Sequence, residues 1–297
     1  MEILKKDLLK LMHSALTGTS HRLSPDADRE ALVKLLYSQG VTALGYQGAV
    51  LCGEDLQSPV MQALADEYCA QLIVSETQLA ELERLQKAFE EENIDYMPLK
   101  GCVLKKLYPS HELRAMSDAD VLIRVEQYDR IKAVMERLGY KQTFDSDHEY
   151  VWEKGYVMTE LHKRLVPSYN EDFYGYYGDG WQLAKPQKGH RYALSPEDTY
   201  VHLVTHLAKH YRDGGIGIRQ MLDLWVWEKA NPKLDRDYVD RQLEQLGLSE
   251  FFRNVEKTLK VWFEDETGDE LTEKVTDRIF GSGLWGSKQA QQLAGVT

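Results

Sequence analysis

The sequence predicts an α+β protein in which a compact unit of strands and helices lies between two helical segments. Apolar residues recur at helical spacing through the first 94 residues and again from residue 186 onward. Between them, short β-prone runs alternate with glycines and one amphipathic helical pattern. We therefore divide the 297-residue chain into an N-terminal helical region (1–94), an α/β core (95–185) and a C-terminal helical region (186–297).

The N-terminal region is predicted to begin with an amphipathic helix at about 3–16. Ser24-Pro25 and Ser58-Pro59 each have the form of an N-cap followed by proline at the first helical position. We expect the first pair to open a helix that ends at Gly40. The second pair is expected to open a long helix that continues to about Glu92.

The core region alternates between strand and helix patterns. The expected elements, in order, are a strand at 96–100, a helix at 102–107, a strand at about 117–125, an amphipathic helix at about 126–138, and a hairpin formed by 149–153 and 156–162 around a Lys-Gly turn. Five short elements in roughly 70 residues predict one small sheet with helices packed beside it.

The C-terminal region repeats the helix-start signal at Ser195-Pro196, and Asn231-Pro232 predicts a break between two of its helices. The final 18 residues, 280–297, are rich in glycine and are expected to be weakly structured. The chain is also a candidate for a fragment whose natural end lies further on.

The composition limits the function. The formal net charge is −12, and we find no dense Lys/Arg run of the kind that neutralises phosphates in proteins that coat nucleic acid. The three cysteines have neither zinc-ligand nor disulfide spacing. No segment has the roughly 18 apolar residues of a membrane span, and the N-terminus does not resemble a signal peptide. We expect a cytoplasmic protein without a membrane partner.

Two aspartates introduce the strongest chemical signal. Asp118 and Asp120 lie two positions apart at the start of the apolar strand 121–123, so their side chains share one face of the sheet. Two ionised carboxylates about 6 Å apart repel by about 3 kcal/mol at an effective dielectric constant near 20. Such a pair is stabilised by a proton, by a basic side chain or by a divalent cation.

A third acid is predicted on the hairpin. Alternation along 156–162 places Glu160 and His162 on the same strand face. If the hairpin pairs beside the aspartate strand, Glu160 joins Asp118 and Asp120 in a cluster that binds Mg²⁺ (or Mn²⁺) for phosphoryl transfer. We therefore predict these three acids as both metal ligands and catalytic residues.

Basic and small residues near the aspartates are candidates for phosphate binding. Lys100 and Gly101 lie where the first strand passes into a helix, and glycine allows close approach of a phosphate. Arg114 precedes Asp118 by four residues and is expected to reach a polyphosphate or the acceptor. Ser117, directly before the first aspartate, is placed with this group.

Several further residues are predicted to lie near the cleft. His202, His206 and His210 recur every four residues, but the outer pair is about 12 Å apart along a helix, which disfavours one shared ion. We expect their face to pack near the active site, with His206 reaching it. His162 either orients a carboxylate or phosphate or is a satisfied strand histidine.

Two other segments leave alternatives open. Arg219 and Asp223 have the i, i+4 spacing of an intrahelical ion pair, although a place at the cleft is the alternative. The aromatic segment 169–181 is either a flap that stacks on a base or acceptor, or a loop that packs its own tyrosines.

The order of these motifs resembles a known family. "PLKGCVLKKLYPSHELRAMSDADVLIRV" followed by "ELHKRL" is similar to an uncharacterised bacterial nucleotidyltransferase family of the DNA polymerase β-like superfamily. The resemblance implies a small mixed sheet, metal ligands at Asp118, Asp120 and Glu160, and the phosphate-loop glycine at Gly101. Two features depart from the superfamily: Cys102 replaces the usual serine, and Asp118 follows Gly101 by 17 positions.

We predict a Mg²⁺-dependent nucleotidyltransferase that moves a nucleoside monophosphate (NMP) from a nucleoside triphosphate (NTP) to a hydroxyl-bearing acceptor and releases pyrophosphate. The acidic composition favours a small-molecule or protein acceptor over a nucleic acid. One alternative is a metal-dependent glycosyltransferase, which would release a nucleoside diphosphate. The other is a non-catalytic regulatory protein on a nucleotidyltransferase scaffold, which would bind no NTP.

Overall fold

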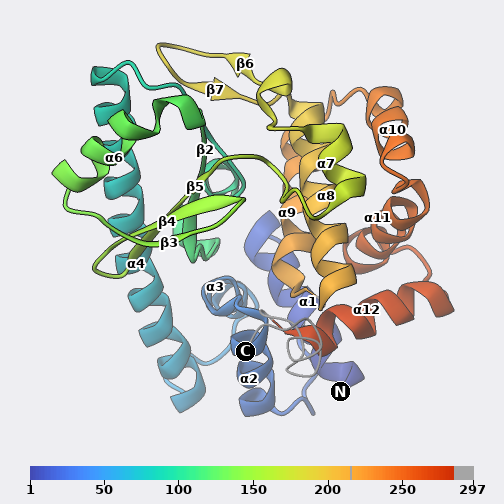
Figure 1. Ribbon diagram of the computed structural model, residues 1–297. Helices are drawn as coiled ribbons and strands as arrows, with labels where there is room; N and C mark the ends of the chain where they lie inside the picture. Colours follow the sequence, from blue (N-terminus) through green and yellow to red (C-terminus); the bar gives the residue numbers. More distant parts are fainter. Residues whose placement is uncertain (215, 284–297) are drawn as a thin grey trace.

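The middle of the chain forms a mixed sheet of five strands in a computed structural model that describes residues 1–214 and 216–283 (Figure 1). Helical segments precede and follow the sheet, so the predicted α+β class with a small mixed sheet is confirmed. In chain order, the strands are β1 (Tyr96–Pro98), β2 (Asp118–Ile123), β3 (Lys141–Asp145), β4 (Glu149–Lys154) and β5 (Val157–His162).

The strand order β1-β2-β5-β4-β3 places the aspartate strand beside the hairpin. β2 pairs parallel with β5, whereas the other neighbouring pairs are antiparallel. In the parallel register, Asp120 lies opposite Glu160. The neighbouring positions on this face therefore come from two segments 40 residues apart in sequence.

One face of the sheet is covered by helices α4 (Pro59–Glu91) and α6 (Tyr128–Arg137) (Figure 1). Residues that alternate with the acids on β2 and β5 point into this apolar layer, among them Val121, Ile123 and Leu161, all buried. The opposite face, which carries the acids, is turned toward the C-terminal helices. Strand alternation therefore separates the core from the site.

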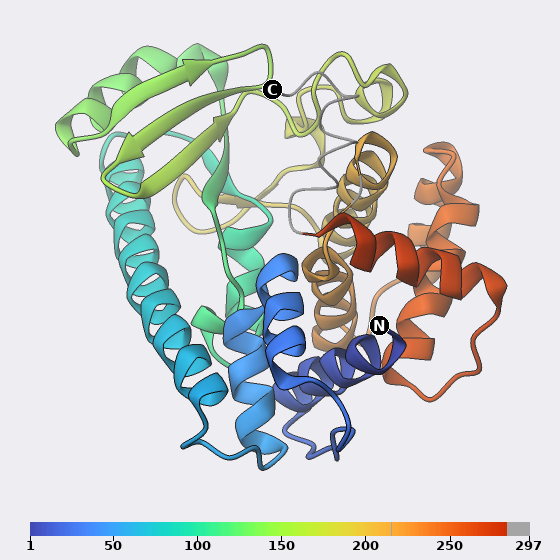
Figure 2. The same cartoon turned by 90° about the horizontal axis from the view of Figure 1, so that it is seen from below.

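A second core joins the helices at the two ends of the chain. These helices are α1 (Glu2–Thr17), α2 (Arg29–Gln39) and α3 (Thr42–Leu51), together with α7 (Glu171–Tyr177), α8 (Pro196–Asp213), α9 (Ile218–Ala230), α10 (Arg236–Gln245), α11 (Ser249–Phe263) and α12 (Glu270–Ser282). Figure 2 shows α1–α3 beside the C-terminal helices, away from the sheet. The three-part division of the chain stays a prediction.

Most predicted helix boundaries are confirmed. The Ser58 and Ser195 side chains accept hydrogen bonds from the backbone N–H groups of Met61 and Asp198, and each cap is followed by proline. Gly40 ends α2 in a left-handed conformation, and α9 ends at the Asn231 cap.

The predicted helix start at Ser24-Pro25 is wrong, because α2 begins at Arg29 with Asp28 as its cap. The Ser24 backbone N–H and hydroxyl instead donate to the buried carboxylate of Asp7 on α1. A serine engaged with a partner 17 residues away is not free to cap a helix.

Three other differences have local explanations. Strand β3 was not predicted because all of its residues are exposed, so it lacks apolar alternation. Segment 169–181 is neither flap nor loop over much of its length, since it contains α7, whose Phe173 and Tyr177 are buried. At the C-terminal end, residues 280–282 belong to α12, and 284–297 lie outside the described residues.

Within the described ranges, no helix combines the length and the apolar character that crossing a membrane requires.

Candidate active site

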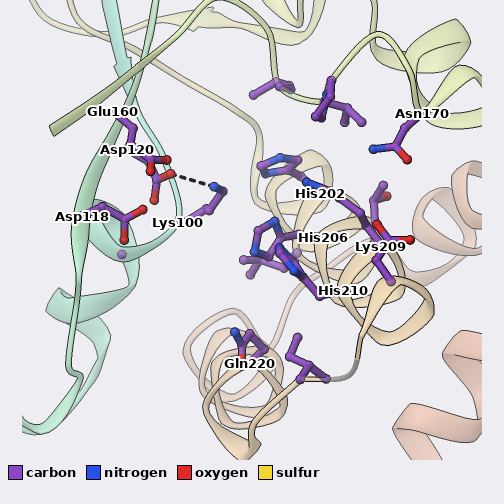
Figure 3. Close-up of a pocket in the computed structure, with 18 of the residues that line it drawn as sticks. Lys100, Asp118, Asp120, Glu160, Asn170, His202, His206, Lys209, His210 and Gln220 are labelled. Atoms are coloured by element: carbon purple, nitrogen blue, oxygen red, sulfur yellow. Dashed lines mark hydrogen bonds and ion pairs between the residues drawn. The ribbon is translucent and has the colours of Figure 1, made fainter. Parts of the chain in front are cut away.

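The open face of the sheet borders a cavity of about 1430 Å³. The strands and the turn after β1 form one wall, and α8 and α9 form the wall opposite. Figure 3 shows Lys100 and the acidic side chains on the sheet side, with the histidines and Lys209 of α8 facing them. Every residue predicted for the site lines this cavity, namely Lys100, Gly101, Arg114, Ser117, Asp118, Asp120, Glu160, His162, His206, Arg219 and Asp223.

Asp118, Asp120 and Glu160 lie on one face of the sheet because β2 and β5 pair in parallel. Asp120 is buried, while Asp118 and Glu160 are partly exposed to the cavity. One oxygen of Asp120, one of Glu160 and a ring nitrogen of His162 lie within 4.8 Å of one another. The structure thus brings Asp120 and Glu160 together, with Asp118 lining the same cavity, and the roles of the three acids as metal ligands and catalytic residues stay a prediction.

Lys100 directly faces the acids. Its ammonium donates a hydrogen bond to Oδ1 of Asp120 at 2.7 Å. The backbone of Lys100 has a φ of 39° and a ψ of −113°, a conformation that non-glycine residues rarely adopt. Strained residues of this kind concentrate at functional sites, where surrounding contacts hold them in place. Here the strain lies at the turn where β1 passes into the short helix α5 (Gly101–Leu104).

The carboxylates on the sheet wall differ in how far neighbouring positive charges stabilise their ionised forms. Burial alone would raise the pKa of Asp120, but Lys100 and His162 outweigh burial and hold that pKa well below its usual range. Burial, followed by the charges of Asp118 and Asp120, raises the pKa of Glu160 to about 9. Without a cation, Glu160 therefore carries a proton at neutral pH.

This arrangement fits a divalent cation. Asp120 and Glu160 place two carboxylate oxygens close together, and Asp118 lies two positions before Asp120 on the same strand face. Carboxylate oxygens are the hard ligands that Mg²⁺ and Mn²⁺ prefer. Burial and then the charges of Asp118 and Asp120 raise the pKa of Glu160, and a bound cation would offset both effects. Asp118, Asp120 and Glu160 are therefore the residues suited to hold such an ion.

The predicted phosphate-binding residues differ in their surroundings and in the hydrogen bonds that they already make within the protein. A Cβ added to Gly101 would lie 2.7 Å from Sδ of Met116 and 2.8 Å from Nη1 of Arg114, so the position has no room for a side chain. Arg114 is buried, and its Nε and Nη2 donate to both carboxylate oxygens of Asp223 at 2.8 Å. The Ser117 hydroxyl donates to Asp118.

The interpretation of Arg219 and Asp223 as an intrahelical ion pair is wrong. Asp223 pairs instead with Arg114 and also accepts a 2.8 Å hydrogen bond from the Tyr108 hydroxyl. Arg219 donates from Nη1 to the carbonyl of Ala115 at 3.1 Å. Their side chains thus connect α9 to the segment before β2, and both line the cavity.

His162 reaches the acids from β5. Its Nε2 lies 2.8 Å from Oδ1 of Asp120, which matches the expectation that it orients a carboxylate. Its Nδ1 faces His148 and Glu149, two residues at the start of the hairpin.

The wall formed by α8 carries neutral histidines around one lysine. Burial lowers the pKa of His202 to about 3 and of His210 to about 4, and it holds the pKa of His206 well below its ordinary value. Burial, and then Lys100, lowers the pKa of Lys209. Among residues 1–214 and 216–283, the closely spaced groups of metal-ligating side chains do not include an α8 histidine.

A family match accompanies this geometry. The sequence model of a family described as "Uncharacterised nucleotidyltransferase" matches residues 25–264, which is most of the chain. The chain belongs to this nucleotidyltransferase family. The predicted family and enzyme class are thereby confirmed.

Two solved structures of the antibiotic-resistance factor ANT(2'')-Ia are similar to this nucleotidyltransferase. The solution structure has a TM-score of 0.41 at 13% identity, covering 65% of this chain and 100% of that one. The crystal structure in complex with adenylyl-2''-tobramycin has a TM-score of 0.41 at 12% identity, covering 60% and 99%. A search of curated proteins finds no match. The family assignment therefore depends on the sequence match.

The cavity residues of this nucleotidyltransferase that sequence reasoning missed include His148, Glu149 and Lys209. The predicted Lys-Gly turn fixes the hairpin register, in which Glu149 lies opposite His162. That register could have identified Glu149. Lys209 lies three positions after His206 on α8, so the helix period that placed His206 near the site could also have identified Lys209.

Proposed function

We propose that this nucleotidyltransferase transfers an NMP from an NTP to a hydroxyl-bearing acceptor and releases pyrophosphate, using Mg²⁺ (or Mn²⁺) held by Asp118, Asp120 and Glu160. The observation that carries the proposal is the parallel register that places Asp120 beside Glu160 on the cavity face. The raised pKa of Glu160, caused by burial and then by the charges of Asp118 and Asp120, supports it, because a bound cation would offset both effects.

The bound cation would neutralise phosphate charge and orient the reacting oxygens. The acceptor oxygen forms a bond to the α-phosphorus, and the bond from that phosphorus to the bridging oxygen breaks. The leaving electron pair departs with pyrophosphate. We assign the proton of the attacking hydroxyl to the Glu160 carboxylate, which lies beside Asp120 on the cavity face and is ionised once the cation is bound.

The charges around the acids support a site for the triphosphate. We assign Lys100, Gly101 and Ser117 to the phosphate contacts, and Arg114 to the support of Gly101, against which its Nη1 packs. Across the cavity, the positive charge of Lys209 faces the same space. A polyphosphate placed between these walls would meet cations from both sides.

The size of the cavity supports two substrates. Pockets that bind one small molecule measure about 300–1,000 Å³, whereas this cavity measures about 1430 Å³. An NTP on the sheet wall therefore leaves room for an acceptor against α8 and α9. We propose a small molecule or an exposed protein hydroxyl as the acceptor.

The test is transfer of label from NTPs labelled at the α-phosphate, incubated with cell extract, while released pyrophosphate is measured. We expect the Asp118→Asn/Asp120→Asn double variant to lose transfer by at least about 10³-fold, because removed charges no longer hold the cation. Asp129→Asn, an exposed position on α6, is the control and should transfer normally. Unchanged transfer by the double variant would refute the proposal, and release of nucleoside diphosphate in place of pyrophosphate would favour the glycosyltransferase.

A further inference from the structure

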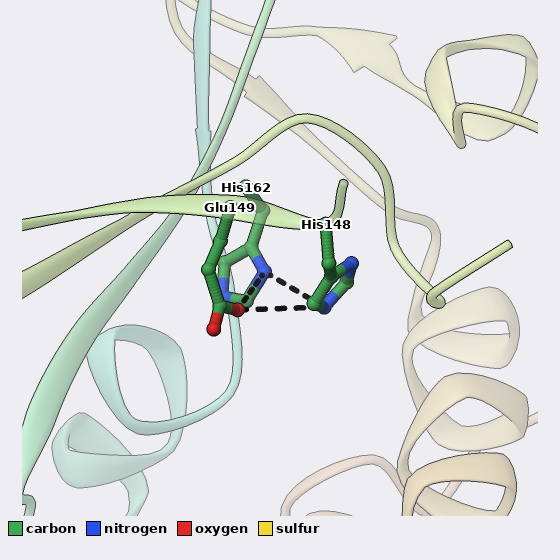
Figure 4. Close-up of side chains that lie close together, drawn as sticks. All are labelled: His148, Glu149 and His162. Carbon is green, nitrogen blue, oxygen red and sulfur yellow. Dashed lines mark hydrogen bonds and ion pairs between the residues drawn. The ribbon is translucent and has the colours of Figure 1, made fainter. Parts of the chain in front are cut away.

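His148, Glu149 and His162 form a second cluster beside the carboxylate site (Figure 4). The antiparallel register of β4 and β5 places Glu149 directly opposite His162. His148 immediately precedes β4, and its backbone N–H donates to the Ser146 hydroxyl, which also accepts from the N–H of Glu149. A hydrogen-bonded turn thus presents two of the three side chains to the third.

The three facing atoms form a nearly equilateral triangle. His148 Nε2 lies 3.2 Å from His162 Nδ1, and Glu149 Oε2 lies 3.4 Å from His162 Nδ1 and 3.6 Å from His148 Nε2. Ligands about 2.0–2.1 Å from an ion at tetrahedral angles are separated by roughly 3.3–3.4 Å. Two of the three separations exceed the usual range of N–H···O hydrogen bonds, about 2.7–3.2 Å. The spacing therefore matches the face of a metal tetrahedron better than a set of hydrogen bonds.

The donor types distinguish this cluster from the neighbouring acids. Two imidazole nitrogens and one carboxylate oxygen are typical ligands of Zn²⁺, whereas Mg²⁺ takes oxygen ligands. All three side chains also line the cavity, so a water molecule or a substrate group can supply a fourth ligand. Open three-residue sites of this composition occur among zinc proteins.

The outer contact of His162 gives independent support. Its other ring nitrogen, Nε2, lies 2.8 Å from Oδ1 of Asp120. Metal-bound histidines almost always donate their second N–H to a carboxylate, a carbonyl or a water molecule, which fixes the tautomer and the ring orientation. His162 has this arrangement, with Nδ1 toward the cluster and Nε2 toward Asp120.

We propose that His148 Nε2, Glu149 Oε2 and His162 Nδ1 bind a transition-metal dication of the Zn²⁺ class, at a site separate from the carboxylate site. An ion on Nδ1 places the ring proton on Nε2, where it donates to Asp120. The site therefore positions one of the three acids and takes no part in bond making. This inference does not depend on the proposed transfer reaction, because ion binding is measured directly.

The test uses the full chain, freed of metal by a chelator and then titrated with Co²⁺ and Zn²⁺ in excess Mg²⁺. We expect one Co²⁺ per chain with the intense visible absorption of a tetrahedral ion, and its displacement by Zn²⁺. His148→Ala and Glu149→Gln should each weaken Zn²⁺ binding by at least about 100-fold, since loss of an outer-shell partner alone costs 10–100-fold.

Two controls separate the sites. His111→Ala removes a histidine that pairs with Glu76 and is not among the residues lining the cavity, and this variant should bind Zn²⁺ within about twofold of the wild type. Asp118→Asn, which impairs the carboxylate site, should also retain Zn²⁺, so a failure of the transfer proposal leaves this result unaffected. The inference is overturned if the wild type takes up no stoichiometric Zn²⁺ or Co²⁺. It is equally overturned if Glu149→Gln and His148→Ala take up Zn²⁺ as the wild type does while Asp118→Asn takes up none. Circular dichroism checks that each variant is folded.

Discussion

Glu160 is the residue whose pKa tests the electrostatics of the site most directly. It lies in a partly buried position beside Asp118 and Asp120, and these conditions raise its pKa to about 9 from an ordinary 4.5. Lys100 is hydrogen-bonded to Asp120, so its compensation is directed mainly at that neighbour. In the absence of a divalent cation, Glu160 is the acid of this cluster that holds a proton.

We predict that Glu160 lowers the stability of the metal-free protein progressively as the pH rises from about 4.5 through about 9. In this window the folded state holds a proton on Glu160 that the unfolded chain has released, so the contribution of Glu160 to the free energy of unfolding falls with pH. The melting temperature of the wild type, measured relative to that of Glu160→Gln at each pH, should therefore fall by several degrees across this window, because the variant has no proton to lose at this position. Added Mg²⁺ should reduce the difference most at high pH.

The comparison of these two proteins by thermal unfolding, each with and without chelator, isolates the effect of Glu160. Parallel pH profiles for wild type and Glu160→Gln would contradict the raised pKa.

Residue-level prediction succeeded where backbone geometry alone decides the outcome. The two-residue period of a strand placed Asp118 with Asp120, and Glu160 with His162, before any tertiary information was needed. It failed for the partner of Asp223, because that partner is Arg114, 109 positions away in the sequence. The helix period instead suggested Arg219 as the partner, because residues four positions apart lie on the same face of a helix.

At the scale of elements, the contact between α9 and the segment before β2 depends on a buried ion pair. Arg114 and Asp223 are both nearly inaccessible to solvent, and the Tyr108 hydroxyl donates to the same carboxylate. A buried charge that loses its partner is strongly destabilising, since neither water nor another acid replaces the lost contacts. This pair therefore joins the sheet wall of the cavity to the α9 wall.

We predict that Asp223→Ala lowers the free energy of unfolding by about 3–5 kcal/mol, because it leaves Arg114 buried without its carboxylate. Urea unfolding of the purified protein measures the change. Asp213→Ala removes a partly exposed acid from the end of α8 and should change the stability by less than about 0.5 kcal/mol.

Replacing both partners by apolar residues, as in Arg114→Met/Asp223→Leu, should recover part of the loss. Equal, small effects for Asp223→Ala and Asp213→Ala would show that the buried pair does not support the cavity walls.

Element boundaries were predictable where the signal is local. The Ser58 and Ser195 caps each bond to an N–H three residues ahead, within the reach of sequence reasoning. The same pattern at Ser24 failed, since Asp7 on another helix binds that serine. Strand β3 gave no signal because an exposed edge strand needs no apolar face.

At the scale of the whole molecule, two hydrophobic cores flank the cavity. One core lies between the sheet and helices α4 and α6, and the other joins the N-terminal helices to the C-terminal ones. The acids extend from the sheet, and His206 and Lys209 extend from α8 toward them (Figure 3). The sequence predicted the α+β class, the sheet wall of this cavity and single residues of the opposite wall such as His206, but the way α8 and α9 pack against the sheet wall depends on long-range contacts.

The central claim is that Asp118, Asp120 and Glu160 together hold a divalent cation on which NTP binding depends. Calorimetric titration of the full chain with an NTP, in the presence and absence of Mg²⁺, tests this claim most directly. We predict binding that requires Mg²⁺ in the wild type and that is lost in the Asp118→Asn/Asp120→Asn variant. Equal NTP affinity without Mg²⁺, or undiminished affinity in that variant, would contradict the account.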